Sequence, residues 1–238
     1  MVEIIQISEK GRRSTNEDYV IYETFNEQTL LVLIADGMGG YEKGDVAAKT
    51  VSTSILEYLR SNLSTESEPL VLIRDACLKA NRAIFKIREE LNKKLGATVA
   101  GILFFRNSAF CFWIGDVRII HFRNNQIKFQ SKDHSLINEL KEQNKIIDTD
   151  SYKRITHIVT KAIQGNHENP EPDVHIVKSI TSKDKYIICS DGVHNVVGPK
   201  EIEIFMQTHH SSQAMIDMIR TNCDEMGNDN YSMVIVTM

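Results

Sequence analysis

Short strand-like runs recur along this chain, and two long amphipathic segments interrupt them in one block; this order constrains the fold more than any other feature. The runs are rich in Val, Ile, Phe and Tyr, and they predict strands at residues 3–8, 19–25, 30–35, 98–105, 109–115, 117–123, 126–130, 174–180, 185–189 and 232–237. Helical spacing of apolar residues predicts helices over 45–61, 69–91 and 211–226. Because the helices are grouped and do not alternate with the strands, the sequence favours an α+β domain with antiparallel sheets over a parallel doubly wound fold.

Composition narrows the class of protein. With 238 residues, of which 42% are hydrophobic and 25% charged, the chain predicts a single globular domain over 1–238. A formal net charge of −4 gives no basic surface for nucleic acid and no polybasic arm for a membrane. No apolar run approaches the ~20 residues of a membrane helix, and the opening MVEIIQISEKGRR lacks the apolar core of a signal peptide. We therefore expect a cytoplasmic protein.

The four cysteines support that expectation. Cys77, Cys111, Cys189 and Cys223 stand far apart without any C-x-x-C pair, and the first three lie among apolar neighbours. They are interpreted as reduced core residues. The alternative, a catalytic thiol, is disfavoured because no cysteine sits at an exposed glycine-rich turn near a histidine.

The segment between His134 and Asp173 is polar and rich in charge, with only short apolar pairs. Two interpretations stand for this insert, about 135–172. It is a small flap subdomain covering a site, or it is a solvated excursion of the chain.

Acidic residues recur where predicted strands begin or end. The apolar run of LVLIADGMGG stops at Asp36, that of YIICSDGV at Asp191 and that of FCFWIGDVR at Asp116, while Asp229 and the pair Glu17–Asp18 directly precede strands. Asp-Gly is a common turn dipeptide, so five independent turns would explain the pattern. The other interpretation is that these ends converge on one site, held by a rigid scaffold.

If the carboxylates at these strand ends converge, their mutual repulsion limits the chemistry that the site can perform. Two unit charges ~4 Å apart repel by about 4 kcal/mol at an effective dielectric near 20, so several carboxylates need cations to offset the repulsion. Oxygen ligands alone suit Mg²⁺ or Mn²⁺. The histidines form no zinc-type cluster. Acids with a hard metal indicate phosphate chemistry.

The order of short motifs resembles a known family. The motifs are RSTNED at 13–18, ADGMGG at 35–40, GATVAG at 96–101, GDVR at 115–118, KDHS at 132–135, CSDGV at 189–193 and DNYS at 229–232. In this order they resemble metal-dependent serine/threonine protein phosphatases of type 2C, in particular the compact bacterial members, over nearly the whole chain. The resemblance implies two packed antiparallel sheets flanked by helices, a four-layer α-β-β-α sandwich with a small flap subdomain.

The resemblance also implies a centre of two metal ions. Asp36, Asp191 and Asp229 would ligate one ion; Glu17, Asp36 and the backbone carbonyl of Gly37 would serve the second, partly through water. Asp36 would bridge the two ions, and residues 39–40 would let the chain turn tightly around them. The cofactors implied are Mn²⁺ or Mg²⁺.

Further roles follow from the same resemblance. Arg13 would hold the phosphate, Asp18 would orient ligands or water, and Asp116 would help to hold a third, weaker ion. Met38 stands where some relatives carry a histidine thought to act as an acid, so the acid for the leaving group is either water on the metals or His134. A lone histidine beside an aspartate is more often structural.

Three smaller departures from the family pattern are visible. Val117 stands where Ser is usual and Ser232 where Thr is usual, and neither is an inferred ligand. The segment LKEQNKI lacks the glycine common in the flap, which puts the turn there in doubt.

The function predicted is hydrolysis of phosphoserine and phosphothreonine in proteins by water activated between two metals, without a phosphoenzyme. The partners would be phosphoproteins, in opposition to a serine/threonine kinase, and the protein would be a monomer that binds neither nucleic acid nor membrane. Two other interpretations remain: a phosphatase-like binding or sensor module with weak catalysis, and a metal phosphohydrolase of small phosphoesters.

Overall fold

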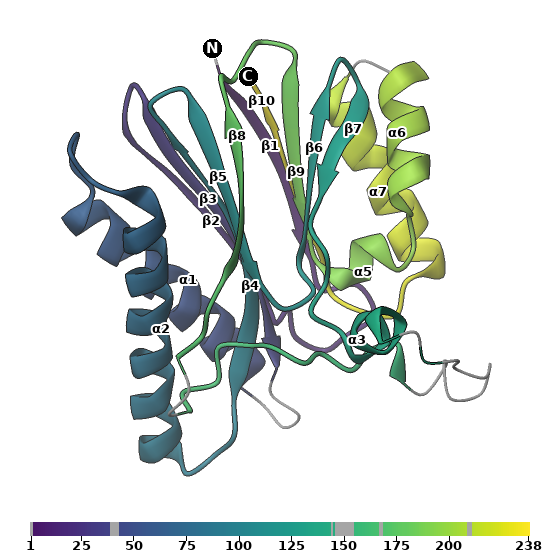
Figure 1. Cartoon of the computed structure of the whole chain (residues 1–238). Helices are drawn as coiled ribbons and strands as arrows, with labels where there is room; N and C mark the ends of the chain where they lie inside the picture. Colours follow the sequence, from purple (N-terminus) through teal and green to yellow (C-terminus); the bar gives the residue numbers. More distant parts are fainter. Residues whose placement is uncertain (1, 39–42, 144, 146–154, 167–168, 209–210) are drawn as a thin grey trace.

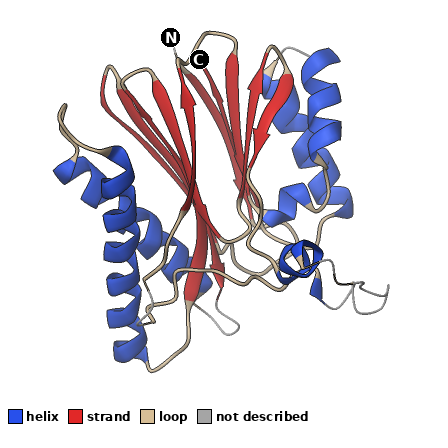
Figure 2. Ribbon diagram, viewed as in Figure 1, coloured by secondary structure: helices blue, strands red, loops and turns tan. Residues whose placement is uncertain are grey.

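Two five-stranded antiparallel sheets lie face to face at the centre of the computed structural model (Figures 1 and 2). The structure describes residues 2–38, 43–143, 145, 155–166, 169–208 and 211–238. One sheet runs in the order β2 (Asp18–Asn26), β3 (Thr29–Met38), β4 (Gly96–Phe105), β5 (Ser108–Ile114), β8 (Asp173–Lys178). The other runs in the order β1 (Glu3–Glu9), β10 (Tyr231–Thr237), β9 (Asp184–Cys189), β6 (Arg118–Arg123), β7 (Gln126–Gln130). Each run predicted as a strand is a strand, which confirms that part of the sequence analysis.

Helices cover the outer face of each sheet (Figure 1). The β2–β8 sheet is covered by α1 (Gly44–Asn62) and α2 (Pro69–Leu91). On the outer face of the second sheet lie α5 (Asp191–His194), α6 (Pro199–Thr208) and α7 (Ser212–Met226). The result is the four-layer sandwich that the sequence resemblance implied. Helices α5, α6 and the short α3 (Leu136–Glu142) were not predicted.

The fully apolar sequence of β3 is explained by burial on both faces. Leu31, Leu33 and Ala35 pack against α1 and α2, whereas Leu30, Val32 and Ile34 pack against the second sheet. Successive side chains of a strand point to opposite faces, so a strand inside a four-layer fold needs apolar residues at every position. The continuous run is therefore a consequence of the layer order.

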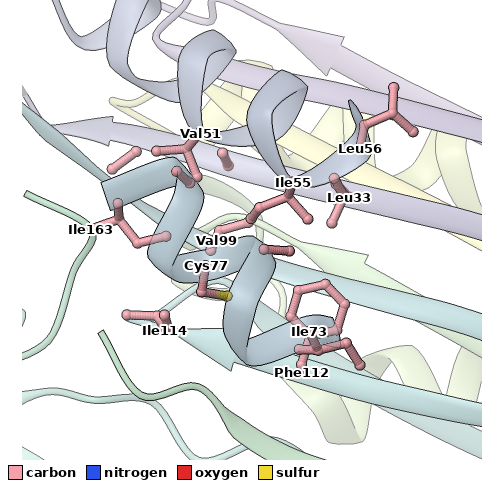
Figure 3. Packing of buried hydrophobic residues seen from close by; sticks show 14 of the residues in the cluster. Leu33, Val51, Ile55, Leu56, Ile73, Cys77, Val99, Phe112, Ile114 and Ile163 are labelled. Atoms are coloured by element: carbon pink, nitrogen blue, oxygen red, sulfur yellow. The ribbon is translucent and has the colours of Figure 1, made fainter. Parts of the chain in front are cut away.

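The cluster between the helices and the first sheet is shown in Figure 3. Ile55 of α1 and Cys77 of α2 lie near Val99 of β4, Ile73 of α2 lies beside Phe112 of β5, and all are completely buried. Apolar positions at helical spacing on the two helices thus meet the strands of the first sheet. This packing fixes α1 against the ends of β2 and β3, where the acidic residues lie.

The predicted hairpin turn and the predicted state of the cysteines both agree with the structure. Asn124 and Asn125 both have positive φ, 55° and 57°, which confirms the predicted two-residue hairpin turn. All four cysteines are free and buried, as expected.

The insert after β7 is only partly within the described residues. Helix α3 follows Ser135, and the amide of Leu136 donates to the carbonyl of Ile158 at 2.9 Å. Ile163 exchanges backbone hydrogen bonds with Ala97 at 2.9 and 3.0 Å, so this part of the insert is attached to β4. Much of the expected flap, including part of LKEQNKI, lies outside the described residues, as do residues 39–40. The flap and the single-domain boundary stay predictions.

Within the described part of the chain, no helix combines the length and apolar character needed to cross a membrane.

A matched pair of substitutions tests the packing of α1. Ile55→Ala removes a fully buried side chain between α1 and the first sheet, and should lower the free energy of unfolding by about 2–5 kcal/mol. Ile204→Ala, in α6, removes a side chain that is 60% exposed and should change it by less than about 0.5 kcal/mol. Urea denaturation measures both values. Similar losses in the two variants would contradict the layer arrangement.

Candidate active site

The sheet register places two of the predicted acids opposite each other. Asp18, at the start of β2, pairs directly with Asp36, near the end of β3. Directly paired residues of antiparallel strands share one face of the sheet. Asp36 has the same parity as Val32 and Ile34, so both carboxylates belong to the face that meets the second sheet.

The second sheet brings its acids to the same end of the sandwich. Asp191 begins α5 immediately after β9, Asp229 lies just before β10, and Asp116 lies between β5 and β6. In Figure 1 these segments meet in the lower half of the molecule, between β4 and α5. The structure therefore supports convergence of the strand ends over five independent turns.

Asp18 is joined to the second sheet by a short chain of hydrogen bonds. Ser190 Oγ donates to Asp18 Oδ2 at 2.7 Å and accepts from the amide of Ser232 at 2.9 Å. Ser232 Oγ contacts Ser8 Oγ at 2.8 Å. Asp18 is only 7% exposed. The Asp18 carboxylate thus connects the two sheets next to its strand partner Asp36, which agrees with the predicted role of Asp18 in orienting ligands or water.

Glu17 holds the start of α1 against the end of β3. Its Oε1 accepts from the amide of Gly44 at 3.2 Å, and its backbone carbonyl accepts from the amide of Gly37 at 3.1 Å. A Cβ on Gly37 would lie 2.0 Å from the Gly44 carbonyl oxygen, and one on Gly44 would lie 2.5 Å from the Glu17 carboxyl carbon. Glycine at position 37 is required for this close approach because the neighbouring atoms are backbone, whereas a side chain at position 44 would displace the Glu17 carboxylate. The backbone amide of Glu17 is in turn held by Asn230 Oδ1 at 2.9 Å.

Arg13 and Asp229 form an ion pair at the edge of the site. Arg13 Nη2 donates to Asp229 Oδ2 at 2.8 Å, and Arg13 Nε donates to the carbonyl of Asn228 at 3.2 Å. The guanidinium is 58% exposed. Arg13 therefore presents a positive charge to solvent beside the carboxylates, where a phosphate could reach it.

The segment that carries Asp116 is fixed by two histidines. His134 Nδ1 accepts from the amide of Gly115 at 2.9 Å, and the backbone amide of His134 donates to the carbonyl of Gly115 at 2.9 Å. His194 Nε2 lies 3.0 Å from the carbonyl oxygen of Asp116. Burial lowers the pKa of His134, and it lowers that of His194 to about 4. Both side chains are neutral at pH 7, and the geometry favours the structural interpretation of His134.

Two cavities open at this end of the sandwich. The larger, of about 1330 Å³, is lined by residues that include Arg13, Glu17, Gly37 and Met38. The smaller, of about 410 Å³, includes Asp116, Asp191 and His194 in its lining. His157 of the insert lines both. Five of the predicted site residues thus line one or the other cavity, whereas Asp18, Asp36 and Asp229 are in neither lining.

Burial and mutual repulsion act on the carboxylates together. Burial, and then the charges of Asp18, Asp191, Asp116 and Asp229, hold the pKa of Asp36 well above its usual value. Burial and the charges of Asp116, Asp229 and Asp18 raise the pKa of Asp191 to about 7. Each carboxylate therefore makes its neighbours harder to ionise.

The remaining acids show the same effect more weakly. Burial and the charge of Asp133 raise the pKa of Asp116 to about 6. Burial raises the pKa of Asp18 in spite of the hydrogen bond from Ser190, and it raises that of Glu17 in spite of the Gly44 amide. A divalent cation would reverse this penalty by stabilising the ionised forms, and an all-oxygen set of donors fits Mg²⁺ or Mn²⁺.

Among the described residues, no three Asp, Glu, His or Cys side chains form a group that could hold one ion unaided. The charges of Asp191 and Asp229 raise the pKa of Asp36, and the charge of Asp229 raises that of Asp191, although these three aspartates, the set implied for one ion, do not form such a group. An ion here would keep several water ligands beside one or two carboxylates, which is the usual way in which Mg²⁺ binds.

Several residues of the site were not found from the sequence. Gly44, Ser190 and His194 act through contacts with Glu17, Asp18 and the Asp116 backbone, and these contacts depend on the strand pairing and on the packing of α1 and α5. For His194 a signal existed, because it lies three residues after Asp191 in the same helical turn.

The chain is similar over most of its length to known proteins. A family model described as protein phosphatase 2C matches residues 7–228. The serine/threonine phosphatase stp of Listeria welshimeri is 27% identical over 237 residues, which cover 96% of this chain and 93% of that protein.

Two solved structures share the fold. That of the S. agalactiae serine/threonine phosphatase has a TM-score of 0.87 at 24% identity and covers 100% of both chains. The catalytic domain of the serine threonine protein phosphatase PstP, in complex with two manganese ions, has a TM-score of 0.79 at 26% identity, covering 99% of this chain and 97% of that one.

The repulsion predicts an unusual pH dependence of stability in the presence of a chelator. Because folding raises the pKa of these aspartates, the folded chain binds more protons than the unfolded chain between about pH 4 and pH 7, and it loses stability as pH rises through that window. Asp191→Asn should stabilise the chelated protein by roughly 1–2 kcal/mol at pH 7 and by little at pH 4. Thermal unfolding at both pH values measures this.

The exposed Asp217 of α7 supplies the matched control, since its side chain is 59% exposed. Asp217→Asn should leave the pH profile unchanged. If Asp191→Asn behaved like this control, the inferred repulsion would be wrong.

Proposed function

The chain belongs to the protein phosphatase 2C family, and we propose that it hydrolyses phosphoserine and phosphothreonine esters of other proteins with two Mn²⁺ or Mg²⁺ ions. It is a serine/threonine protein phosphatase, as its relatives are named. The observation that carries the metal dependence is the set of buried carboxylates, which raise one another's pKa at one end of the sandwich. Such a set is costly for the fold unless cations offset its charge.

The proposed ligands follow the family motifs. Asp36, Asp191 and Asp229 would hold one ion, and Glu17, Asp36 and the Gly37 carbonyl would hold the other, in part through water. Asp116 would hold a third and weaker ion. The chemistry supplied by such ions would be polarisation of the phosphoryl group and activation of water as the nucleophile, so that no phosphoenzyme would be needed.

Residues of the chain itself would bind the substrate phosphate and position the metal ligands. Arg13 would take the non-bridging phosphate oxygens with its planar guanidinium, exchanging part of its pairing with Asp229. Asp18, which accepts a hydrogen bond from Ser190, would keep its strand partner Asp36 in position. His134 Nδ1 accepts from the Gly115 amide, its Nε2 lies 3.4 Å from Asp173 Oδ2, and the residue lines neither of the two cavities; we therefore assign the proton for the leaving alkoxide to water and not to His134.

Thiol chemistry does not compete with this proposal. The four cysteines are buried, and burial raises the pKa of Cys77 and Cys189 to about 12, so neither is a thiolate at neutral pH. The same reduced, buried thiols agree with the proposed cytoplasmic location. Opposition to a serine/threonine kinase and a monomeric state are also part of the proposal.

Turnover of phosphopeptides with and without Mn²⁺ tests the function. Peptides carrying phosphoserine or phosphothreonine should be hydrolysed only when Mn²⁺ or Mg²⁺ is present, with a higher kcat/KM than for phosphotyrosine peptides or small metabolite phosphates. Absence of turnover with intact phosphopeptide binding would favour a sensor module. A higher kcat/KM for metabolites would favour a hydrolase of small phosphoesters.

Arg13→Ala tests the phosphate contact. Loss of a charge-assisted bidentate contact should weaken binding by about 2–3 kcal/mol, and should appear mainly as a large increase in KM for a phosphopeptide. The neighbouring Arg12 is a matched control, since its guanidinium binds the carbonyls of Asp224 and Glu225 outside the cavity lining. Arg12→Ala should leave KM nearly unchanged. An equal effect of the two substitutions would remove Arg13 from the site.

Asp116→Ala tests the third ion. Asp116 lines the smaller cavity together with Asp191 but is not among the ligands implied for the two main ions, so the substitution removes none of those ligands. A serine or threonine alkoxide needs a proton to leave, whereas nitrophenolate does not. The variant should therefore lose far more activity on phosphopeptides than on p-nitrophenyl phosphate. Equal losses would show that Asp116 supports the main ions or the fold.

A further inference from the structure

We propose that the larger cavity continues beyond the phosphate position into a cationic subsite, formed by Arg88 and Lys94, that binds a second anionic group of the same substrate polypeptide. The second group is an acidic side chain or another phosphorylated residue near the one being hydrolysed. The inference rests on the proposed function, because it names the class of phosphoprotein that this site prefers.

The cavity is larger than a phosphate requires. Its volume of about 1330 Å³ exceeds that of a typical pocket for a drug-sized molecule, roughly 300–1,000 Å³. Arg13, Glu17 and Gly37 line one part, and Arg88, Lys94 and Gln164 line another. An extended stretch of substrate can therefore lie between the phosphate position and α2.

The backbone limits how far Lys94 lies from the phosphate position. Gly96 pairs with Met38 across β3 and β4, and Lys94 lies two residues before Gly96. Neighbouring strands are about 4.8 Å apart and two residues span at most about 7 Å, so the Cα atoms of Lys94 and Met38 lie within about 12 Å. An extended peptide covers that distance in about two to four residues.

Arg88 is held in place before any substrate binds. Its guanidinium donates to the backbone carbonyl of Gln164. The segment around Gln164 is fixed in turn, since Ile163 pairs with Ala97 and a Cβ on Gly96 would lie 2.8 Å from Gln164 Cγ. Because this arginine is already ordered, an anion that binds it incurs less loss of side-chain entropy.

Asn81 of α2 also attaches the insert to this helix. Its Oδ1 accepts from the amide of Gly165 at 2.7 Å, and its Nδ2 donates to the carbonyl of Asn166 at 2.9 Å. Asn166 also lines the cavity. This wall is thus built from α2 and the insert together, with its backbone groups paired.

Charge distinguishes the two parts of the cavity. Among the described lining residues, the acids are Glu17 and Asp45, and both belong to the part formed by the ends of the strands and α1. Arg88 and Lys94 lie on α2 and the turn that follows it, where the neutral Gln164 and Asn166 are their neighbours. In the described part of the chain Lys94 has no ion pair, and its side chain is exposed. A second anion of the substrate is repelled near the carboxylates and attracted near α2.

Steady-state kinetics on a matched set of peptides tests the subsite. One phosphothreonine peptide carries neutral residues at the two to four positions on each side, a second carries Glu there, and a third carries a second phosphothreonine. Wild-type protein should hydrolyse the two anionic peptides with a kcat/KM about three- to tenfold above that of the neutral one, at low salt.

Lys94→Gln, Arg88→Gln and the double variant should reduce that ratio toward one. Lys93 is a matched control, because it is exposed and adjacent to Lys94 but does not line the cavity. Lys93→Gln should keep the wild-type ratio. A thermal unfolding curve for each variant verifies that Arg88→Gln still folds, and Lys94→Gln alone suffices if it does not.

Fluorescence anisotropy of the same peptides supplies a readout that needs no turnover. If wild-type protein hydrolyses none of the peptides but still binds the anionic ones more tightly, and Lys94→Gln removes that difference, the proposed function fails and the subsite stands. Equal kcat/KM and equal affinity for all three peptides in wild-type protein, or a preference that persists in the double variant, would overturn the subsite. A gain for the doubly phosphorylated peptide alone would identify a second phosphate as the group that binds.

Discussion

Repulsion among carboxylates that the backbone does not allow to separate is the constraint on which this structure depends. Asp18 and Asp36 are paired residues of neighbouring strands, and Asp191 and Asp229 are fixed by the ends of β9 and β10. Their burial on rigid strands raises the pKa of Asp36 and Asp191 through one another's charges. Only protonation or bound cations relieve such a cost, so the fold and the metal chemistry are two aspects of one arrangement.

Much of the surrounding structure holds these carboxylates at the required positions. The hydrogen bond from Ser190 to Asp18 joins the two sheets, and Gly37 and Gly44 allow α1 to approach the end of β3. Arg13 partly offsets the charge of Asp229, and His134 fixes the Gly115 turn next to Asp116. These contacts are local, but each acts on a different strand end, and together they determine the shape of both cavities.

The strands and the acids at their ends could be predicted from the sequence because both depend on local patterns. Runs rich in Val, Ile, Phe and Tyr identified each strand of the described residues, and apolar runs that stop at an acid identified Asp36, Asp116 and Asp191. The helix α6 was missed because it is ten residues long with a mixed sequence, although Pro199 and the spacing of Ile202 and Met206 are typical of a short helix.

Contacts between distant segments could not be predicted in the same way. Nothing near Arg88 in the sequence indicates that its guanidinium meets the carbonyl of Gln164, 76 residues later. That contact depends on the pairing of Ala97 with Ile163, which is an isolated bridge and not part of a named strand. Side chains that line a cavity from such segments are found only when the fold is known.

Calorimetric titration of Mn²⁺ into wild-type protein and Asp36→Asn tests the central claim most directly. The charges of Asp191 and Asp229, the other two aspartates proposed as ligands of the main ions, both raise the pKa of Asp36. The account predicts that wild-type protein binds at least two ions, and that Asp36→Asn folds normally but loses this binding together with phosphopeptide hydrolysis. Unchanged stoichiometry and affinity for Mn²⁺ in Asp36→Asn would contradict it.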